Sequence, residues 1–479
     1  MKVEISFNDV YVFFDFYLNQ KEEQKLQHKV HMNNRSCFFK LPVKINEKDI
    51  HPDLLAMASL LCVFPFISDE LVLPFGVSNE FACIVKKQLN IDIPKKDANL
   101  APRKIDNGRP GLAYSGGVDS TAALSLMPEN TVVMFLDRIM PSFKKHLYDK
   151  TAPLSALKDL QAIREEVYSI PTNLEYLRTP VGFPVDTFNP EIPLAVGIPF
   201  LLLADIFQID SIGTGTILEV GTGTILEVGT GTGFEKFQNF GLTPFVISWA
   251  PIFEIIACEL FFPTIGLSEV ATTKIDIQNP HSLFTRSCMR GNSLQPCNKC
   301  IKCFRKNTLT KVLLKQDVKL EDIVFNINSR EVILNIYPDI HRVQNIYRYI
   351  ANKAIANPFF DELKKRISNS QEDVSWMERW YHKTIVFIPQ KYREEYSSKL
   401  SRYIEPMNEN DIEFIENWEK DKYKKSEETI KKWQEYLDTL IKDEKLLAYA
   451  HSLKPTLKPI EFQKENLFKK MIKIIGLKK

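Results

Sequence analysis

Short apolar and polar runs alternate along the first hundred residues. Residues 3–7 and 11–14 carry runs typical of β-strands, whereas the apolar stretch at 54–67 and the residues around Phe81 predict helices. A polar, proline-containing stretch at 94–110 has the composition of a linker. We therefore expect an α+β accessory domain over residues 1–107.

Strand and helix patterns alternate in the middle of the chain. Residues 112–114, 131–136 and 206–212 predict strands. Residues 121–127, 157–168 and 199–207 predict helices. Alternation of this kind favours a parallel sheet, so the sequence predicts an α/β domain over residues 108–308.

The last third of the chain changes character. Residues 411–425 and 426–445 are highly charged, with apolar residues at helical spacing, and predict an α-helical domain over residues 309–479. The final 27 residues, 453–479, hold eight lysines and two glutamates. A solvated amphipathic helix is expected there, and RNA or an acidic protein are the alternative partners. We expect four tryptophans of this domain to pack in its core: Trp376, Trp380, Trp418 and Trp433.

Composition adds bounds but no specific chemistry. The 479 residues are 44% hydrophobic and 25% charged, which is ordinary for a globular protein of two or three domains. A net charge of +2 gives no general attraction to nucleic acid or membranes. The apolar runs at 54–67 and 192–204 are shorter than a membrane span and contain proline, and the N-terminus lacks an apolar signal segment. These features predict a cytoplasmic protein.

A glycine loop with the sequence Ser-Gly-Gly-Val-Asp-Ser stands between a predicted strand and a predicted helix. Two glycines let the backbone N–H groups approach phosphate oxygens, and the helix adds its N-terminal dipole. The serines can donate hydrogen bonds to phosphate, and the carboxylate can hold Mg²⁺. A plain strand-to-helix turn is the alternative. The predicted nucleotide-binding residues are Ser115, Gly116, Gly117, Val118, Asp119 and Ser120.

This hexapeptide resembles the PP-loop of the ATP pyrophosphatase superfamily, whose core has the adenine nucleotide alpha hydrolase-like fold. The resemblance implies an ATP-dependent enzyme that releases AMP and pyrophosphate, with Ser115, Asp119 and Ser120 as catalytic residues. The loop lacks the lysine of P-loop ATPases, which argues against ADP-forming phosphoryl transfer. Asp137 ends the second predicted strand, where similar enzymes contact the adenosine, although a simple strand-ending aspartate fits equally well.

Four cysteines form a C-x8-C-x2-C-x2-C motif within sixteen residues. The short spacers let neighbouring sulfurs converge on one ion, and the longer spacer returns the first cysteine as the fourth ligand, which suits structural Zn²⁺. Nearby lysines and arginines, at positions 299, 302, 305 and 306, are expected to favour the thiolates. An iron-sulfur cluster is the main alternative, and buried or disulfide-paired cysteines are another. The predicted ligands are Cys288, Cys297, Cys300 and Cys303.

A PP-loop followed by this cysteine spacing resembles the QueC family, the 7-cyano-7-deazaguanine synthases. The resemblance covers about residues 108–308, including a segment at 249–259 that is similar to the family's Pro-leading helix before the zinc loop. The usual lysine is missing there, with Ala257-Cys258 before Glu259.

The QueC resemblance implies adenylation of 7-carboxy-7-deazaguanine or a related acid. Amide or nitrile formation with ammonia or a protein amine would follow. QueC-like proteins with extra domains occur in bacterial defence loci, so the long flanks favour a partner protein.

An eight-residue sequence, Gly-Thr-Gly-Thr-Ile-Leu-Glu-Val at 213–220, is repeated without change at 221–228 and begun again at 229–232. Two and a half copies are too few to stack into a core, so we interpret them as a duplication in a loop whose second copy is dispensable. The first copy places Gly213, Thr214 and Glu219 at the carboxyl end of a strand, where ligands bind in open α/β sheets.

Two other functions fit these motifs. One is a PP-loop enzyme that modifies tRNA as a thiolase or an amidotransferase. The other is a scaffold that binds nucleotide without turnover.

Overall fold

The computed structural model describes residues 1–26, 32, 34–139, 150–174, 177, 194–218, 237, 239–288, 296–327, 344–355, 357–366, 372–418 and 427–452. Glu219, the second repeat copy and the basic tail at 453–479 lie outside this part of the chain. None of the helices in the described residues is both long and apolar enough to cross a membrane.

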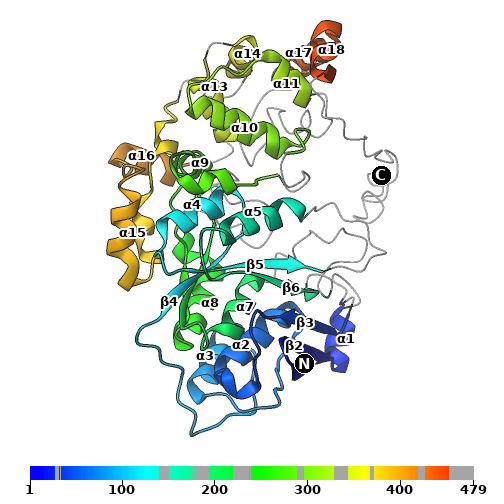
Figure 1. Ribbon diagram of the computed structural model, residues 1–479, viewed down its shortest axis with the longest axis vertical. Coiled ribbons are helices and arrows are strands. Elements are labelled where there is room, and N and C mark those ends of the chain that lie inside the picture. Colours follow the sequence, from blue (N-terminus) through cyan, green and yellow to red (C-terminus); the bar gives the residue numbers. More distant parts are fainter. Residues whose placement is uncertain are drawn as a thin grey trace.

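One eight-stranded sheet, in the order β1-β2-β3-β6-β5-β4-β7-β8, organises the molecule (Figure 1). An antiparallel meander forms one side: β1 (Lys2–Asn8), β2 (Tyr11–Tyr17) and β3 (Ser36–Lys40). It joins the rest through the pair Phe39 and Thr172. The other five strands are parallel to one another: β4 (Arg109–Ala113), β5 (Val132–Arg138), β6 (Val167–Thr172), β7 (Ile209–Thr214) and β8 (Glu259–Phe261).

Helices cover both faces of the parallel strands, as the alternating pattern predicted. The residues of β5 show why: Val132 and Met134 belong to one apolar core, whereas Val133 and Phe135 belong to another. A strand buried on both faces needs a helical layer on each side. The first layer holds α2 (Pro52–Val63), α3 (Asn79–Leu89), α7 (Ile198–Leu203) and α8 (Pro244–Ile255). The second holds α4 (Val118–Leu126), α5 (Thr151–Gln161) and α9 (Glu269–Gln278).

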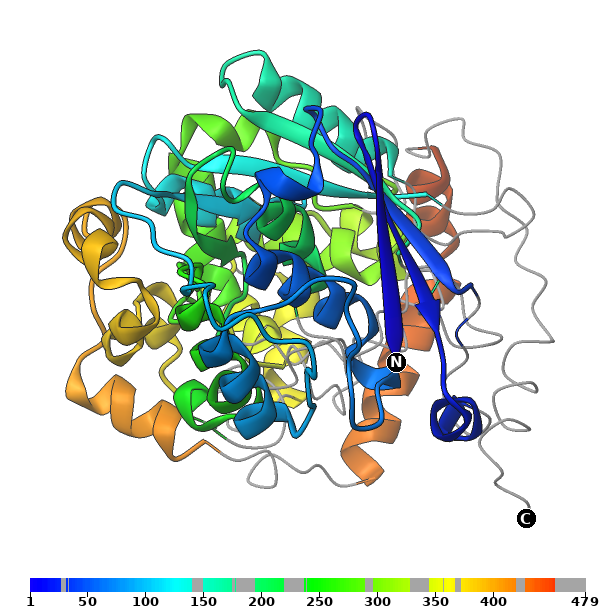
Figure 2. The same ribbon diagram turned by 90° about the horizontal axis from the view of Figure 1, so that it is seen from below.

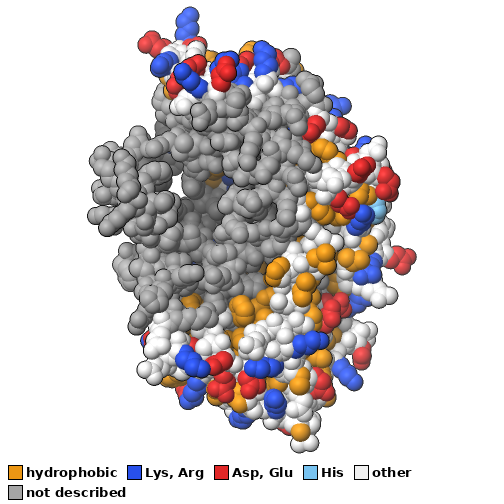
Figure 3. All heavy atoms as spheres, turned by 180° about the vertical axis from the view of Figure 1, so that it is seen from behind, with side chains coloured by type: hydrophobic (Ala, Val, Ile, Leu, Met, Phe, Trp, Pro, Cys, Tyr) orange, Lys and Arg blue, Asp and Glu red, His pale blue; other side chains and the backbone are white. Residues whose placement is uncertain are grey.

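Further helices stack beyond α4, α5 and α9 around a separate apolar core (Figure 1). These are α10 (Ile301–Leu313), α11 (Leu320–Ile327), α13 (Gln344–Lys353), α14 (Pro358–Arg366) and α17 (Glu427–Lys442). Helix α18 (Glu444–Ser452) lies against α11 and α17. As expected, Trp376, Trp418 and Trp433 are buried, whereas Trp380 is only partly buried. Charged side chains of both signs gather at the outer end of this layer, over α17 and α18 (Figure 3), where Lys432 pairs with Glu428.

Segments from both flanking regions of the chain pack on the central α/β unit. The view from below shows the β1–β3 meander at one edge and α15 (Arg393–Leu400) at the opposite side (Figure 2). The meander, with short helix α1 (Gln20–Leu26) beside it, shares a core with α7 and α8. Helix α15 packs on α4, and α16 (Glu409–Glu416) follows it. One apolar core contains residues from both sides of position 107, and another contains residues from both sides of position 308. The domain boundaries at these two positions stay predictions.

Two sequence predictions about elements were wrong. Only the first residues of 157–168 are helical, because the chain leaves α5 after Gln161 and then forms β6 from Val167. In the segment compared with the Pro-leading helix, α8 ends at Ile255 and Glu259 begins β8. Ala257 between them has a positive φ of 47°, which breaks the helix. The helix that precedes the cysteine motif is α9.

Candidate nucleotide and metal site

The glycine loop lies where the order of the parallel strands reverses. Strand β4 is central, with β5 on one side and β7 on the other, and the chain passes from β4 to β5 and β6 before it returns to β7. Open α/β sheets bind ligands at the carboxyl ends of the strands beside such a reversal. Residues 115–120 follow the carboxyl end of β4 and lead into α4, so they occupy this position.

The backbone of the loop needs its first glycine. Gly116 has a φ of +74°, and a Cβ atom there would lie 2.9 Å from the Cβ atom of Ala156 in α5. Gly117 then leads into α4 in an extended conformation. The two serines face each other, with 3.2 Å between their hydroxyl oxygens, and Ser120 donates to the Gly117 carbonyl at 3.0 Å.

A segment just before the cysteine motif lies against this loop. The N–H of Arg286 donates to the Gly116 carbonyl at 2.6 Å, and the N–H of Val118 donates to the Ser287 hydroxyl at 3.3 Å. The hydroxyl oxygen of Ser287 therefore accepts from one of the backbone N–H groups predicted to bind phosphate.

Asp119 belongs to a buried polar network. Its Oδ1 atom accepts from Thr272 at 2.7 Å and from the ammonium group of Lys306 at 3.4 Å. Lys306 also pairs with Glu269 at 3.2 Å, and Glu269 pairs with Arg305 at 2.9 Å. Burial alone would lower the pKa of Lys306, but the two carboxylates raise it, so this lysine carries a charge.

A second carboxylate, Asp276, lies beside this network. It accepts from the Thr285 hydroxyl at 2.7 Å, and the hydroxyl oxygens of Thr285 and Thr121 of α4 lie 3.1 Å apart. Burial, together with the nearby charge of Asp119, raises the pKa of Asp276 to about 6. The carboxylates of Asp119 and Asp276 are hard oxygen donors of the kind that Mg²⁺ prefers, so their chemistry fits the predicted ion.

A cavity of about 210 Å³ opens between the loop and the cysteine motif. Its described walls hold three basic side chains, Arg286, Lys302 and Lys306, and one acidic side chain, Asp276. Val118 of the loop, Ser287 and Cys303 contribute to the same walls. An excess of positive charge next to a helix N-terminus favours anionic ligands.

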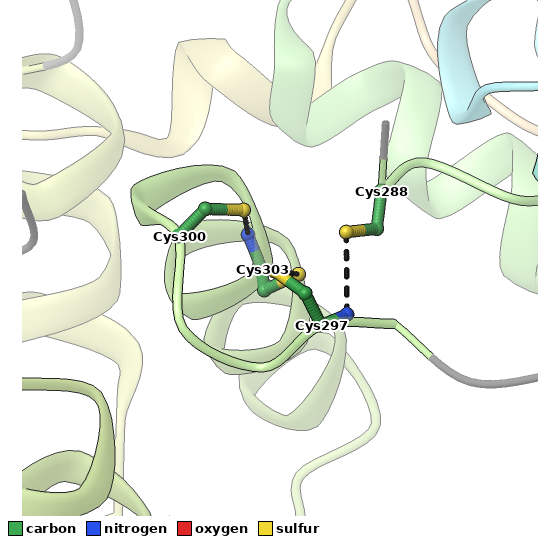
Figure 4. Close-up of side chains that lie close together, drawn as sticks. All are labelled: Cys288, Cys297, Cys300 and Cys303. Atoms are coloured by element: carbon green, nitrogen blue, oxygen red, sulfur yellow. Dashed lines mark hydrogen bonds between the residues drawn. The ribbon is translucent and has the colours of Figure 1, made fainter. Parts of the chain in front are cut away.

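The four cysteines converge as the spacing predicted (Figure 4). Their sulfur atoms all lie within 4.8 Å of one another, and those of Cys297 and Cys303 are 3.7 Å apart. Tetrahedral zinc with Zn–S bonds of about 2.3 Å requires sulfur separations of about 3.8 Å. Backbone N–H groups donate to Cys288 and Cys300, as expected for thiolates. The donor set and its spacing therefore fit a structural Zn²⁺ ion.

The cysteine motif and the glycine loop are linked through neighbouring residues that contact both. Cys288 directly follows Ser287, which contacts the loop, and Cys303 lies one turn before Lys306 in α10. Lys306 and Arg305 pair with carboxylates, and the expectation that nearby basic residues favour the thiolates stays a prediction.

The remaining predicted residues lie at the carboxyl ends of strands. Asp137 is near the end of β5 and pairs with Lys150 at 2.6 Å. Gly213 and Thr214 end β7, opposite Leu112 and Ala113 of β4. Gly213 permits close packing, because a Cβ atom there would lie 2.8 Å from the Met127 side chain.

Sequence reasoning missed several residues that contact the loop or line the cavity, among them Arg286, Thr272 and Asp276. They lie more than 150 residues beyond the loop in the sequence, and no motif identifies them. The one available signal was the proximity of Arg286 and Ser287 to the first cysteine.

Comparison with protein families gave one match. Residues 248–419, about a third of the chain, match the model of a family of unknown function (DUF6395). The matched stretch contains the cysteine motif and α9 to α16 but not the glycine loop. No curated protein and no solved structure matched the chain.

Proposed function

We propose that this protein binds ATP at residues 115–120 and uses it to adenylate a carboxylate, releasing pyrophosphate and then AMP. The observation that carries the proposal is the position of the loop. It lies at the strand-order reversal and opens, through Val118, onto a cavity whose walls carry three basic side chains and one acidic one. The QueC-like motifs favour 7-carboxy-7-deazaguanine or a related heteroaromatic acid as the substrate.

The residues around the cavity suit distinct roles. The loop N–H groups and the cations of Arg286, Lys302 and Lys306 would bind the triphosphate. Asp119 and Asp276 would hold Mg²⁺, which neutralises phosphate charge when bound. Lys306 keeps the Asp119 carboxylate oriented at 3.4 Å. Zn²⁺ on the four cysteines would fix Ser287 and α10 against the loop, a structural role.

The proposed reaction needs no covalent bond between the substrate and a catalytic side chain. A carboxylate oxygen of the substrate attacks the α-phosphorus of ATP, the bond to the β-phosphate oxygen breaks, and pyrophosphate leaves. An amine, either ammonia or a protein amine, then attacks the acyl carbon and displaces AMP to give an amide. Positioning and the positive charge of the cavity carry most of the expected rate enhancement.

The test is AMP and pyrophosphate release from ATP, with and without 7-carboxy-7-deazaguanine, with products identified by mass spectrometry. Asp119→Asn keeps the shape of the side chain but removes its charge, and we expect a loss of activity of at least about a hundredfold. Asp9→Asn, at an exposed carboxylate in the N-terminal hairpin, is the matched control and should retain activity.

The pattern of products decides among the candidate functions. AMP that depends on the deazapurine supports the proposal, and the product mass separates nitrile, free amide and protein conjugate. AMP formation that depends on tRNA would instead support the function of a tRNA-modifying enzyme. ADP as product, or full function in Asp119→Asn, would overturn adenylation at this loop.

A further inference from the structure

The nucleotide cavity draws its positive charge from residues next to the cysteines. Three basic side chains line its described walls: Arg286, Lys302 and Lys306. Arg286 stands two residues before Cys288. Lys302 and Lys306 lie on either side of Cys303, in the first turns of α10. The centre formed by the four cysteines therefore sets where this charge lies.

The segment that carries the first cysteine is bonded to the glycine loop. The N–H of Arg286 donates to the Gly116 carbonyl at 2.6 Å. The Ser287 hydroxyl accepts from the N–H of Val118 at 3.3 Å. Helix α4 begins at Val118 and has a glycine as its N-cap, so Ser287 supplies the oxygen acceptor that an N-cap side chain usually provides. Displacement of this segment would leave both backbone groups of the loop without these partners.

The last cysteine is joined to the loop from the other side. Cys303 and Lys306 share the first turns of α10, and the ammonium group of Lys306 lies 3.4 Å from the Asp119 carboxylate. Figure 4 shows that the sulfur atoms come from two stretches of chain, with Cys288 on one and the other three at the start of α10. An ion that binds all four sulfurs would hold these two stretches together around the loop.

The cysteines are within reach of small solutes. Cys288 and Cys303 line the nucleotide cavity, and Cys297 is partly exposed. Thiolates are the nucleophilic form of cysteine, and their oxidation follows thiolate character and exposure. A small neutral oxidant such as hydrogen peroxide can therefore reach this centre.

We propose that the four cysteines form a redox switch, which holds the glycine loop and the positive charge of the cavity in place only while they are reduced and bind zinc. The consequence for ATP rests on the function proposed above. The part of the inference that concerns the loop itself does not.

The oxidation is a two-electron step with hydrogen peroxide as the oxidant. The Cys297 sulfur attacks one peroxide oxygen, the O–O bond breaks and hydroxide leaves. The Cys303 sulfur, 3.7 Å away, then attacks the oxidised sulfur, so an S–S bond forms, the S–O bond breaks and a second hydroxide leaves. Each sulfur loses one electron, the peroxide oxygens gain both, and two protons from the solvent convert the hydroxides to water. Only two thiolates remain for the metal, which is then released.

The experiment treats the full-length, zinc-loaded protein with hydrogen peroxide and follows three quantities. A chromogenic chelator measures zinc release, hydrogen–deuterium exchange measures the backbone amides of residues 115–120, and calorimetry measures ATP affinity. We expect release of one zinc per chain and exchange at 115–120 that is about tenfold faster, the effect of losing one or two hydrogen bonds. ATP affinity should fall by at least about tenfold, because charged contacts are lost. Thiol reduction with added zinc should reverse all three effects.

Two variants locate the cause. Cys83→Ser removes an exposed cysteine outside the motif and should respond to peroxide as the wild type does. Ser287→Ala removes the acceptor for Val118 but no zinc ligand. Without peroxide, it should retain zinc and exchange about threefold faster at 115–120. Peptides from β5 are the internal control, and their exchange should stay unchanged.

Three results would overturn the inference. One is zinc that stays bound in millimolar peroxide. Another is zinc release that leaves exchange at 115–120 unchanged. The third is an equal rise of exchange in β5, since zinc loss would then unfold the protein as a whole. Failure of the reduced, zinc-loaded wild type to bind ATP would count against the adenylation proposal, whereas zinc release and amide exchange would still decide the redox inference.

Discussion

Replacing Gly215 with alanine tests how tightly the first repeat copy is packed against the nucleotide loop. A Cβ atom on Gly215 would lie 2.8 Å from the backbone nitrogen of Ser120 and 2.9 Å from the carbonyl carbon of Asp119. These are backbone atoms at the start of α4, so no side-chain rotation can relieve the contact.

The expected loss of stability follows from these distances. Ordinary contacts of this kind begin at 3.4 Å, so Gly215 and the start of α4 must separate by about 0.6 Å. Overpacking of this kind costs about 1–3 kcal/mol of the free energy of unfolding. Because the shift moves Asp119 and Ser120, we also expect ATP affinity to fall by about tenfold or more.

The assay is urea denaturation together with calorimetric ATP binding. Gly197→Ala is the matched control, since the nearest atom to its new Cβ would be 3.5 Å away in the Ile212 side chain. That variant should stay within about 0.5 kcal/mol of wild type. If Gly215→Ala matches the control in both measurements, the close packing of Gly215 on the start of α4 is refuted.

The Cys297→Ser variant loses one zinc ligand, so it should no longer bind the one zinc ion per chain, and its thermal midpoint of unfolding should fall. Metal analysis and thermal melting measure the two effects. Iron with labile sulfide in the wild-type protein would contradict zinc. Glu269→Gln leaves two buried cations without their shared carboxylate and should cost about 3–5 kcal/mol in urea denaturation at pH 7, so a loss below about 1 kcal/mol would count against the network. Asp276 has its pKa raised from 3.8 to about 6, so its contribution to stability is fully present below pH 4 and is lost as the pH rises through 6. Asp276→Asn should therefore stabilise the protein at pH 7 by about 1–3 kcal/mol and give no gain at pH 4; a gain of equal size at both pH values would exclude titration as the cause. Deleting residues 221–228 should preserve folding and AMP formation, and a folded but inactive deletion variant would show that the second copy is needed.

The sequence by itself determined the features that depend on near neighbours. The glycine loop, the parallel strands around it and the convergence of four cysteines could all be predicted, because local backbone geometry and short ligand spacings act over a few residues. The break after α5 and the strand character of Glu259 were missed, because short apolar segments fit helix and strand patterns alike.

Only the tertiary structure decided which distant residues complete the site. The pairing of Lys306 with Asp119, the contact of Ser287 with the loop and the wall formed by Asp276 join segments more than 150 residues apart. The joining of the N-terminal meander to β6 is of the same kind. Such contacts are set by how helices pack on both faces of the sheet, and no local pattern in the sequence encodes that packing.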